Sequence, residues 1–294
     1  MLKTSKFRIV LIQTLILNKS ISTRSIQNYH TLPRLFIPHT PQTTRLNTGT
    51  QVPLSGQQIH YLTTVLRLGS NRKKQSQVRI FNSINGEWLG TIHHHSKKEI
   101  NIECIEQLRP PQTNKHNCWL LFAPIQQPKR LKYMIEKCTE MGVSKFIPFV
   151  SDRTQLNNIK WESLMMKWRA IAIEASEQCE RLDVPIIDFD VSDNIGAPLD
   201  MKQLLNEWEE MDRILYICCE RNNNNNFFHA MQNKNVSFMI GPEGGWSDAE
   251  LDFICDKAND TIQLLSLGDN VLRAETAAIV SVAGWSLWRS CNDD

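Results

Sequence analysis

The chain has 294 residues, of which 41% are hydrophobic and 22% are charged, which is the balance of an ordinary globular protein. This length accommodates one large domain or two ordinary ones, each with a core of its own. No run reaches the roughly 18 consecutive apolar residues that would span a bilayer, so a membrane role is not indicated.

The net charge of +2 conceals an uneven distribution along the chain. The first 86 residues contain 12 Lys and Arg and no Asp or Glu, whereas the rest contain 21 Lys and Arg and all 31 Asp and Glu. Such asymmetry predicts a basic arm or domain that binds a polyanion. A targeting peptide would account for part of the same charge.

Residues 1–28 are basic, rich in Ser and Thr, and free of acidic residues, which is typical of an organelle transit peptide. A secretory signal with residues 9–17 as its apolar core is the alternative. That core is interrupted by Gln13 and Thr14, and no small-residue cleavage site follows it. We therefore expect import into the mitochondrion, with the plastid as the second choice.

Residues 29–110 are predicted to form a small β-rich domain with one helix. The helix is expected at residues 59–68, where apolar side chains recur at helical spacing. Asn85 and Gly86 form an Asn-Gly pair between two alternating segments, which predicts a hairpin turn. The expected strands cover residues 33–38, 78–81, 87–92 and 99–105.

Beyond a proline-containing linker at residues 110–114, predicted strands and helices alternate. This order predicts a parallel sheet covered by helices on both faces, in a domain of residues 115–294. The expected strands cover residues 118–123, 146–150, 214–219, 236–240 and 262–267. The expected helices cover residues 130–141, 161–180, 247–258 and 274–287.

The eight cysteines form no C-x-x-C pair, and none has a histidine at zinc-finger spacing. Most of them lie in apolar stretches, so we expect reduced, buried thiols. Three consecutive histidines at residues 93–95 lie between two predicted strands, where an exposed hairpin tip explains them better than a metal site. No metal is predicted.

A glycine-rich segment at residues 241–245 follows one predicted strand and precedes a helix. Ser247 and Glu250 form a capping box that begins this helix. The glycines allow the backbone to approach a ligand and expose amide N–H groups. A tight turn without a ligand would use the same residues. The segment matches neither the dinucleotide fingerprint nor the P-loop.

Two other segments place charged residues where ligands bind in α/β proteins. Arg273 and Glu275 follow a predicted strand and begin an apolar helix, although Glu275 could serve only as a helix cap. Glu174, Glu177 and Arg181 share one face of the long predicted helix. A solvated, salt-bridged face is the alternative for these three.

These three segments together resemble the RsmE family, the ribosomal small-subunit RNA (uracil-N3) methyltransferases of the SPOUT superfamily. Residues 33–36, His60, 65–67, 136–143 and 147–148 add further matches, and the resemblance covers about residues 33–288. It implies an α/β fold: a C-terminal SPOUT domain with a parallel sheet and a trefoil knot. A small PUA-like β-barrel that binds RNA would precede it.

The resemblance also implies an activity, a cofactor and partners. We expect S-adenosylmethionine-dependent methylation of N3 of a specific uridine in small-subunit ribosomal RNA, by a homodimer with its active site near the subunit interface. The partner would be this RNA or the small ribosomal subunit. Three loops would hold the donor, largely through backbone groups of Cys219, Glu220, Gly241, Pro242, Glu243, Gly244, Gly245, Leu265, Leu267, Gly268, Val271 and Leu272.

The candidate catalytic residues are Arg273, Glu275, Glu177 and Arg181. Arg273 could stabilise negative charge that develops on the uracil oxygens. Glu275 or Glu177 could orient that arginine or accept the N3 proton, and the sequence does not decide between them. Phosphate contacts are expected from Arg34, Arg67, Arg72, Lys73 and Lys74.

This chain departs from the family pattern at Asp269, Asn270 and Ala274, and in the asparagine run at residues 222–226. These departures leave open a catalytically inactive RNA-binding ribosome assembly factor of the same fold. An oxidoreductase with a nucleotide cofactor is a further alternative, and the missing G-x-G-x-x-G motif argues against it.

Overall fold

The structure is a computed structural model of the chain. It describes residues 29–43, 45–65, 68, 76–96, 99–112, 117–155, 160–189, 198–208, 211–219, 227, 231 and 235–292. The predicted transit peptide lies outside these residues. The chain divides into two compact units, Met1–Leu32 and Pro33–Asp294, and the described part of the first is a short 3-10 helix, η1 (Tyr29–Thr31).

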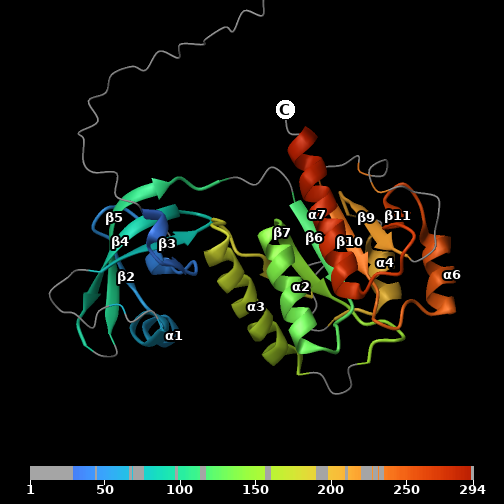
Figure 1. The fold of residues 1–294 in the computed structure, drawn as a ribbon, viewed down its shortest axis with the longest axis horizontal. Helices are drawn as coiled ribbons and strands as arrows, with labels where there is room; N and C mark the ends of the chain where they lie inside the picture. Colours follow the sequence, from blue (N-terminus) through green and yellow to red (C-terminus); the bar gives the residue numbers. More distant parts are fainter. Residues whose placement is uncertain are drawn as a thin grey trace, which may run out of the picture. The chain divides into compact units, whose positions relative to one another are not determined.

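The first sheet of the second unit has five strands in the order β1-β3-β4-β5-β2 (Figure 1). β1 pairs parallel with β3, and the remaining pairs are antiparallel. The predicted hairpin is confirmed: Gly86 has φ 72°, and a Cβ there would lie 2.2 Å from the Arg109 oxygen. The strands are β1 (Arg34–Phe36), β2 (Gln51–Pro53), β3 (Gln77–Asn82), β4 (Gly86–His94) and β5 (Ile100–Arg109).

The predicted helix beside this sheet begins earlier than expected. Ser55 and Gln58 form a capping box, which places the start of α1 (Gly56–His60) at Gly56. A π-helical turn, η3 (Tyr61–Val65), continues it. A 3-10 turn, η2 (Pro41–Thr43), lies between β1 and β2. Ile59 and Leu62 are buried in the core of this sheet.

The second sheet has six strands in the order β11-β9-β10-β6-β7-β8, and every neighbouring pair is parallel. The predicted parallel sheet is therefore confirmed. The two-residue strand β8 was not predicted because it is too short to show an alternating pattern. The strands are β6 (Asn117–Phe122), β7 (Val143–Pro148), β8 (Ile186–Ile187), β9 (Ile214–Cys218), β10 (Asn235–Ile240) and β11 (Ile262–Leu265).

Helices cover both faces of the parallel sheet. Leu120 and Phe122 of β6 belong to a cluster with α2, α3 and α7, whereas Leu121 belongs to a cluster with α4 and α6. Figure 1 shows α2 beside α3 and α7. The helices are α2 (Pro128–Glu140), α3 (Trp161–Gln178), α4 (Met201–Trp208), α6 (Asp248–Lys257) and α7 (Ala274–Asn292).

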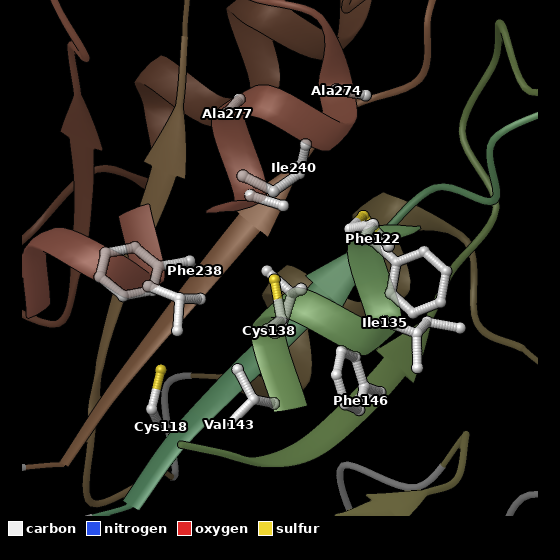
Figure 2. Close-up of a cluster of buried hydrophobic side chains, with 14 of the residues drawn as sticks. Cys118, Phe122, Ile135, Cys138, Val143, Phe146, Phe238, Ile240, Ala274 and Ala277 are labelled. Carbon is white, nitrogen blue, oxygen red and sulfur yellow. The ribbon is translucent and has the colours of Figure 1, made fainter. Parts of the chain in front are cut away.

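Figure 2 shows how the first of these clusters closes over the sheet. Ile135 and Cys138 of α2 lie beside Phe122 and Phe146 of the adjacent strands, and all four are at most 1% exposed. Because the central strands are buried on both faces, their sequences are nearly continuous apolar runs. Among the described residues, no helix is both long and apolar enough to cross a membrane.

The C-terminal end of α3 is tied to the first sheet by Arg34. Its Nε donates to Glu87 Oε1 at 2.6 Å, and its other nitrogens donate to the backbone oxygens of Ser176, Glu177 and Arg181 at 2.7–3.0 Å. Arg34 is only 5% exposed. The prediction that Arg34 contacts RNA is therefore wrong, because its guanidinium is buried and satisfies the free carbonyls at a helix end.

Candidate active site

A pocket of about 720 Å³ lies at the carboxyl ends of β9, β10 and β11. Ligands bind at this edge in open parallel sheets, and the volume suits a small molecule. Three loops that follow these strands supply most of the lining. The lining residues are Arg130, Arg153, Cys218, Cys219, Ile240, Gly241, Pro242, Glu243, Gly244, Gly245, Trp246, Leu251, Leu267, Gly268, Asn270, Val271, Leu272, Arg273, Ala274, Glu275 and Ala277.

The glycines of the loop after β10 have different physical roles. Gly245 has φ 71° and its N–H donates to the Pro242 oxygen at 2.9 Å. Apart from its chain neighbours, no atom of the described residues lies within 4 Å of where a Cβ would be. A Cβ at Gly241 would lie 2.8 Å from the Trp246 ring. That ring stacks on Phe149 with centroids 6.0 Å apart. Gly241 therefore allows close packing, and Gly245 allows a left-handed turn beside the pocket.

This loop is held by the segment that follows β7, which the sequence analysis did not identify. The predicted capping box of Ser247 and Glu250 is confirmed. Glu250 Oε1 also accepts hydrogen bonds from Ser151 Oγ at 2.8 Å and from the Asp152 N–H at 3.0 Å. Arg153 Nη1 donates to the Gly244 oxygen at 2.9 Å. The glycine-rich loop is thus fixed from outside as well as by its own turn.

Two carboxylates and one arginine meet at the wall of the pocket. The Arg130 guanidinium lies 3.7 Å from Glu243 Oε1 and 3.5 Å from Glu275 Oε1. Glu243 Oε2 accepts a hydrogen bond from the Gln126 N–H at 3.1 Å. Glu275 is 9% exposed, and its Oε2 has no partner among the described residues. A buried oxygen without a partner is costly in the protein alone and suits a ligand that carries a donor or a positive charge.

The loop after β11 forms the remaining wall. β11 ends at Leu265, two residues earlier than predicted, and Gly268 has φ 115°. Arg273 is exposed at the pocket, and the described residues offer its side chain no partner. Leu265 is fully buried and does not line the pocket, so its predicted place in the donor site is wrong. Its backbone oxygen instead accepts the Cys219 N–H at 3.1 Å.

Most of the other predicted donor-site residues do line the pocket. Glu220 lies outside the described residues, as do Arg67, Arg72, Lys73 and Lys74. The sequence analysis missed Arg130 and Arg153, since neither follows a strand that it associated with the donor. The predicted donor-site residues that line the pocket are Cys219, Gly241, Pro242, Glu243, Gly244, Gly245, Leu267, Gly268, Val271 and Leu272.

Glu177 lies in the last turn of α3, Arg181 lies three residues beyond the end of this helix, and neither residue lines the pocket. Glu177 Oε1 accepts the Phe36 N–H at 2.9 Å, and burial raises the pKa of its carboxyl to about 7. Arg181 donates to the Thr139 and Val143 oxygens at 2.6 and 2.9 Å. These contacts correct their predicted catalytic roles to structural ones.

The pocket offers no thiolate nucleophile. Burial raises the pKa of the Cys218 and Cys219 thiols to about 12, and only the thiolate is a strong nucleophile. Within the described residues, no three His, Cys, Asp or Glu side chains are grouped to hold a metal ion. The chemically distinctive groups of the pocket are therefore its peptide groups, carboxylates and guanidinium groups.

The fold and the pocket define an α/β protein with a small-ligand site at the edge of its parallel sheet, joined to a β-rich domain. Family models agree: an RNA methyltransferase domain matches residues 112–286, and an RNA methyltransferase PUA domain matches residues 54–104. The chain belongs to the ribosomal RNA small subunit methyltransferase E family.

Individual relatives support this assignment. The chain is 33% identical over 242 residues to ribosomal RNA small subunit methyltransferase E of Rickettsia conorii, covering 81% of this chain and 91% of the relative. The relative from Synechocystis is 28% identical, with 79% and 71% covered. One similar structure is a methyltransferase from Legionella pneumophila with bound S-adenosylmethionine. It is 25% identical in sequence to this chain, and the TM-score is 0.71. The match covers 98% of that structure and 88% of this chain.

Proposed function

We propose that this protein transfers a methyl group from S-adenosylmethionine to N3 of a specific uridine in small-subunit ribosomal RNA. The observation that carries the proposal is the pocket, with its glycine-rich loop and the buried Glu275 Oε2, which has no partner in the described part of the chain. Membership of the family supports both the reaction and the RNA substrate. The Legionella relative with bound S-adenosylmethionine supports the identity of the donor.

The residues of the pocket fit this donor. S-adenosylmethionine carries a positively charged sulfonium and an ammonium group, and the pocket contains two carboxylates, Glu243 and Glu275. Open space beside Gly245 and Gly268 leaves their peptide groups accessible for close approach. When bound, the donor supplies an electrophilic methyl group that is transferred to the nucleophile, with neutral S-adenosylhomocysteine as the leaving group.

The protein must then remove a proton from uridine N3 and stabilise the charge that this creates. Glu275 Oε2 is a buried acceptor without a partner among the described residues, so it can take this proton directly or through a water molecule. The exposed guanidinium of Arg273 can stabilise negative charge on the uracil oxygens. Glu177, the other candidate acceptor, is bonded to the Phe36 N–H and does not line the pocket, and for this reason we favour Glu275.

The direct test uses the purified protein, S-adenosylmethionine with a labelled methyl group, and small-subunit RNA from cells that lack the modification. We expect 3-methyluridine at one position. Donor binding without methyl transfer would favour the inactive assembly factor, and calorimetry that detects NAD but not S-adenosylmethionine would favour the oxidoreductase. Mapping 3-methyluridine in organellar small-subunit RNA from a deletion strain would test the function in the cell.

We also propose that the protein is a homodimer and that its parallel-sheet domain is knotted, both on the strength of the family resemblance. For a dimer of the full chain, light scattering should give a mass of twice 34.0 kDa. A monomer at micromolar concentration would contradict it.

The mitochondrion is our proposed location, supported by the acid-free, basic composition of residues 1–28. These residues, fused to a fluorescent reporter, should carry it into mitochondria. A reporter that enters plastids, is secreted or stays in the cytosol would refute this location.

A further inference from the structure

Three guanidinium groups line the pocket, and they differ in how many of their donors are used. Arg130 lies between two carboxylates, those of Glu243 and Glu275. Arg273 has no side-chain partner among the described residues. Arg153 is exposed and donates from Nη1 to the Gly244 oxygen at 2.9 Å, its only hydrogen bond with the described part of the chain. Because an arginine has five N–H donors, Arg153 keeps Nε and Nη2 for a ligand.

The surroundings of Arg153 hold it in place. The N–H of the preceding residue, Asp152, is bonded to Glu250 Oε1 at 3.0 Å, and Ser151 Oγ is bonded to the same oxygen at 2.8 Å. The carboxylate of Asp152 is engaged as well, because Ser247 Oγ donates to its Oδ2 at 2.6 Å. The free N–H groups of Arg153 are therefore preorganised beside the pocket, which reduces the entropy cost when a ligand binds.

The order of the strands separates Arg153 from Arg273 across the pocket. Arg153 follows β7 and Arg273 follows β11, and β6, β10 and β9 lie between those two strands. An RNA whose target base enters the pocket must have that base unstacked, with its backbone passing over this edge of the sheet. Phosphate groups on either side of the target nucleotide would then come near these two arginines.

We propose that Arg153 is a positioning residue that binds a backbone phosphate of the RNA next to the target nucleotide, on the side of the pocket opposite Arg273. The proposal rests on the proposed function. The planar guanidinium can donate to two phosphate oxygens at once. Its hydrogen bond to the Gly244 oxygen orients the remaining N–H groups. The same side chain would link the RNA to the loop that holds the methyl donor.

The test compares Arg153→Gln with the wild-type protein. Glutamine removes the charge but keeps an NH₂ group that can donate to the Gly244 oxygen. We expect the Kd for a single-stranded RNA containing the target uridine to rise by roughly tenfold or more. The slope of log Kd against log salt should fall by about 0.7. The affinity for S-adenosylmethionine in calorimetry should not change, and the RNA KM should rise with kcat largely kept.

Lys167→Gln is the matched control, since Lys167 is exposed on α3, does not line the pocket and carries the same charge. It should leave RNA binding unchanged. Arg153→Lys should restore part of the RNA affinity, because a lysine still presents a positive charge to a phosphate. Weaker donor binding with unchanged RNA affinity and salt slope in Arg153→Gln would overturn the proposal and assign Arg153 to bracing the loop alone. Failure of the wild-type protein to methylate would refute the proposed function, while these RNA-binding data would still decide the role of Arg153.

Discussion

At the scale of single residues, Gly245 is a pocket position where the backbone conformation restricts the side chain. Its φ of 71° lies in the left-handed region, where a residue with a Cβ is strained by about 1–2 kcal/mol. The space a side chain would enter is the pocket itself. Gly244→Val has a different consequence, because its Cβ would lie 3.4 Å from the Arg153 Cβ and would press on that side chain.

We predict that Gly245→Val abolishes S-adenosylmethionine binding in calorimetry, because the side chain both strains the turn and occupies donor space. Gly49→Val is the control, since Gly49 also has positive φ, open space around it, and a place beside the first sheet. It should be destabilised to a similar extent and still bind the donor. Donor affinity retained in Gly245→Val would remove this loop from the donor site.

Substitution of Arg273 should affect methyl transfer much more than RNA binding. We predict that Arg273→Ala keeps most RNA binding and loses methyl transfer, because its interaction strengthens only as charge develops on the base. A purely structural role, in which Arg273 would hold Glu275 in place, is not assigned to it. The arginine that lies next to Glu275 is Arg130, at 3.5 Å. Single-turnover rates and RNA Kd values provide the measurement. A folded Arg273→Ala protein with near-normal methylation would exclude this residue from the mechanism.

The half-buried carboxyl of Glu177 predicts a dependence of stability on pH. Burial raises its pKa from 4.5 to about 7, so its contribution to stability is present below about pH 4.5 and is lost as the pH rises through 7. Glu177→Gln stays neutral and keeps an oxygen for the Phe36 N–H. We therefore expect this variant to melt at a higher temperature than the wild type near pH 8, and at nearly the same temperature near pH 5. A lower Tm for the variant near pH 8 would contradict the assignment.

At the scale of elements, the end of α3 and the strands of the first sheet share one buried ion cluster. Glu87 is 2% exposed and lies 2.6 Å from Arg34, 2.7 Å from Arg109 and 3.6 Å from Arg79. Arg34 and Arg109 also donate to backbone oxygens at the end of α3, including the Glu180 oxygen at 3.0 Å. The cluster therefore joins four strands of the first sheet to the C-terminal end of α3.

We predict that Glu87→Gln destabilises the protein by about 3–5 kcal/mol, because it leaves buried arginines without their counter-charge. Glu103→Gln on β5 is the control, since its pair with His93 is partly exposed. Exposed pairs contribute at most about 1 kcal/mol. Urea unfolding of both variants provides the measurement, and equally small decreases in stability would show that the cluster is not a structural element.

At the scale of the whole molecule, the basic residues before Glu87 predict that one part of the chain binds RNA and another binds the methyl donor. Arg72, Lys73 and Lys74 lie in the acid-free part of the chain and outside the described residues. Replacing all three with Ala should weaken RNA binding and lower the salt slope by roughly 0.7–0.9 for each phosphate that the protein no longer binds. Calorimetry should show unchanged donor affinity. An unchanged RNA affinity and slope would exclude this segment from RNA recognition.

The sequence by itself determined most of the elements and much of the pocket, because local spacing records them. It did not predict β2, β8 or α4. The alternation of strands and helices along the chain predicted a parallel sheet covered on both faces. Glycines at 241–245 and 268 predicted turns where a backbone approaches a ligand, and the structure places both at the pocket. The capping box of Ser247 and Glu250 was visible as a pattern within four residues, and the structure forms it.

Only the tertiary structure decided the roles of residues whose partners are distant in the chain. Arg34 had the composition signal of an RNA-binding cation, yet it bonds to Ser176, which is 142 residues away, and is buried. Glu177 and Arg181 shared a predicted helix face, but α3 ends at Gln178, so Arg181 lies beyond the helix, and neither residue lines the pocket. Arg153 lies 91 residues from the glycine it supports. Such pairings depend on how strands and helices are ordered in space, which spacing along one segment does not encode.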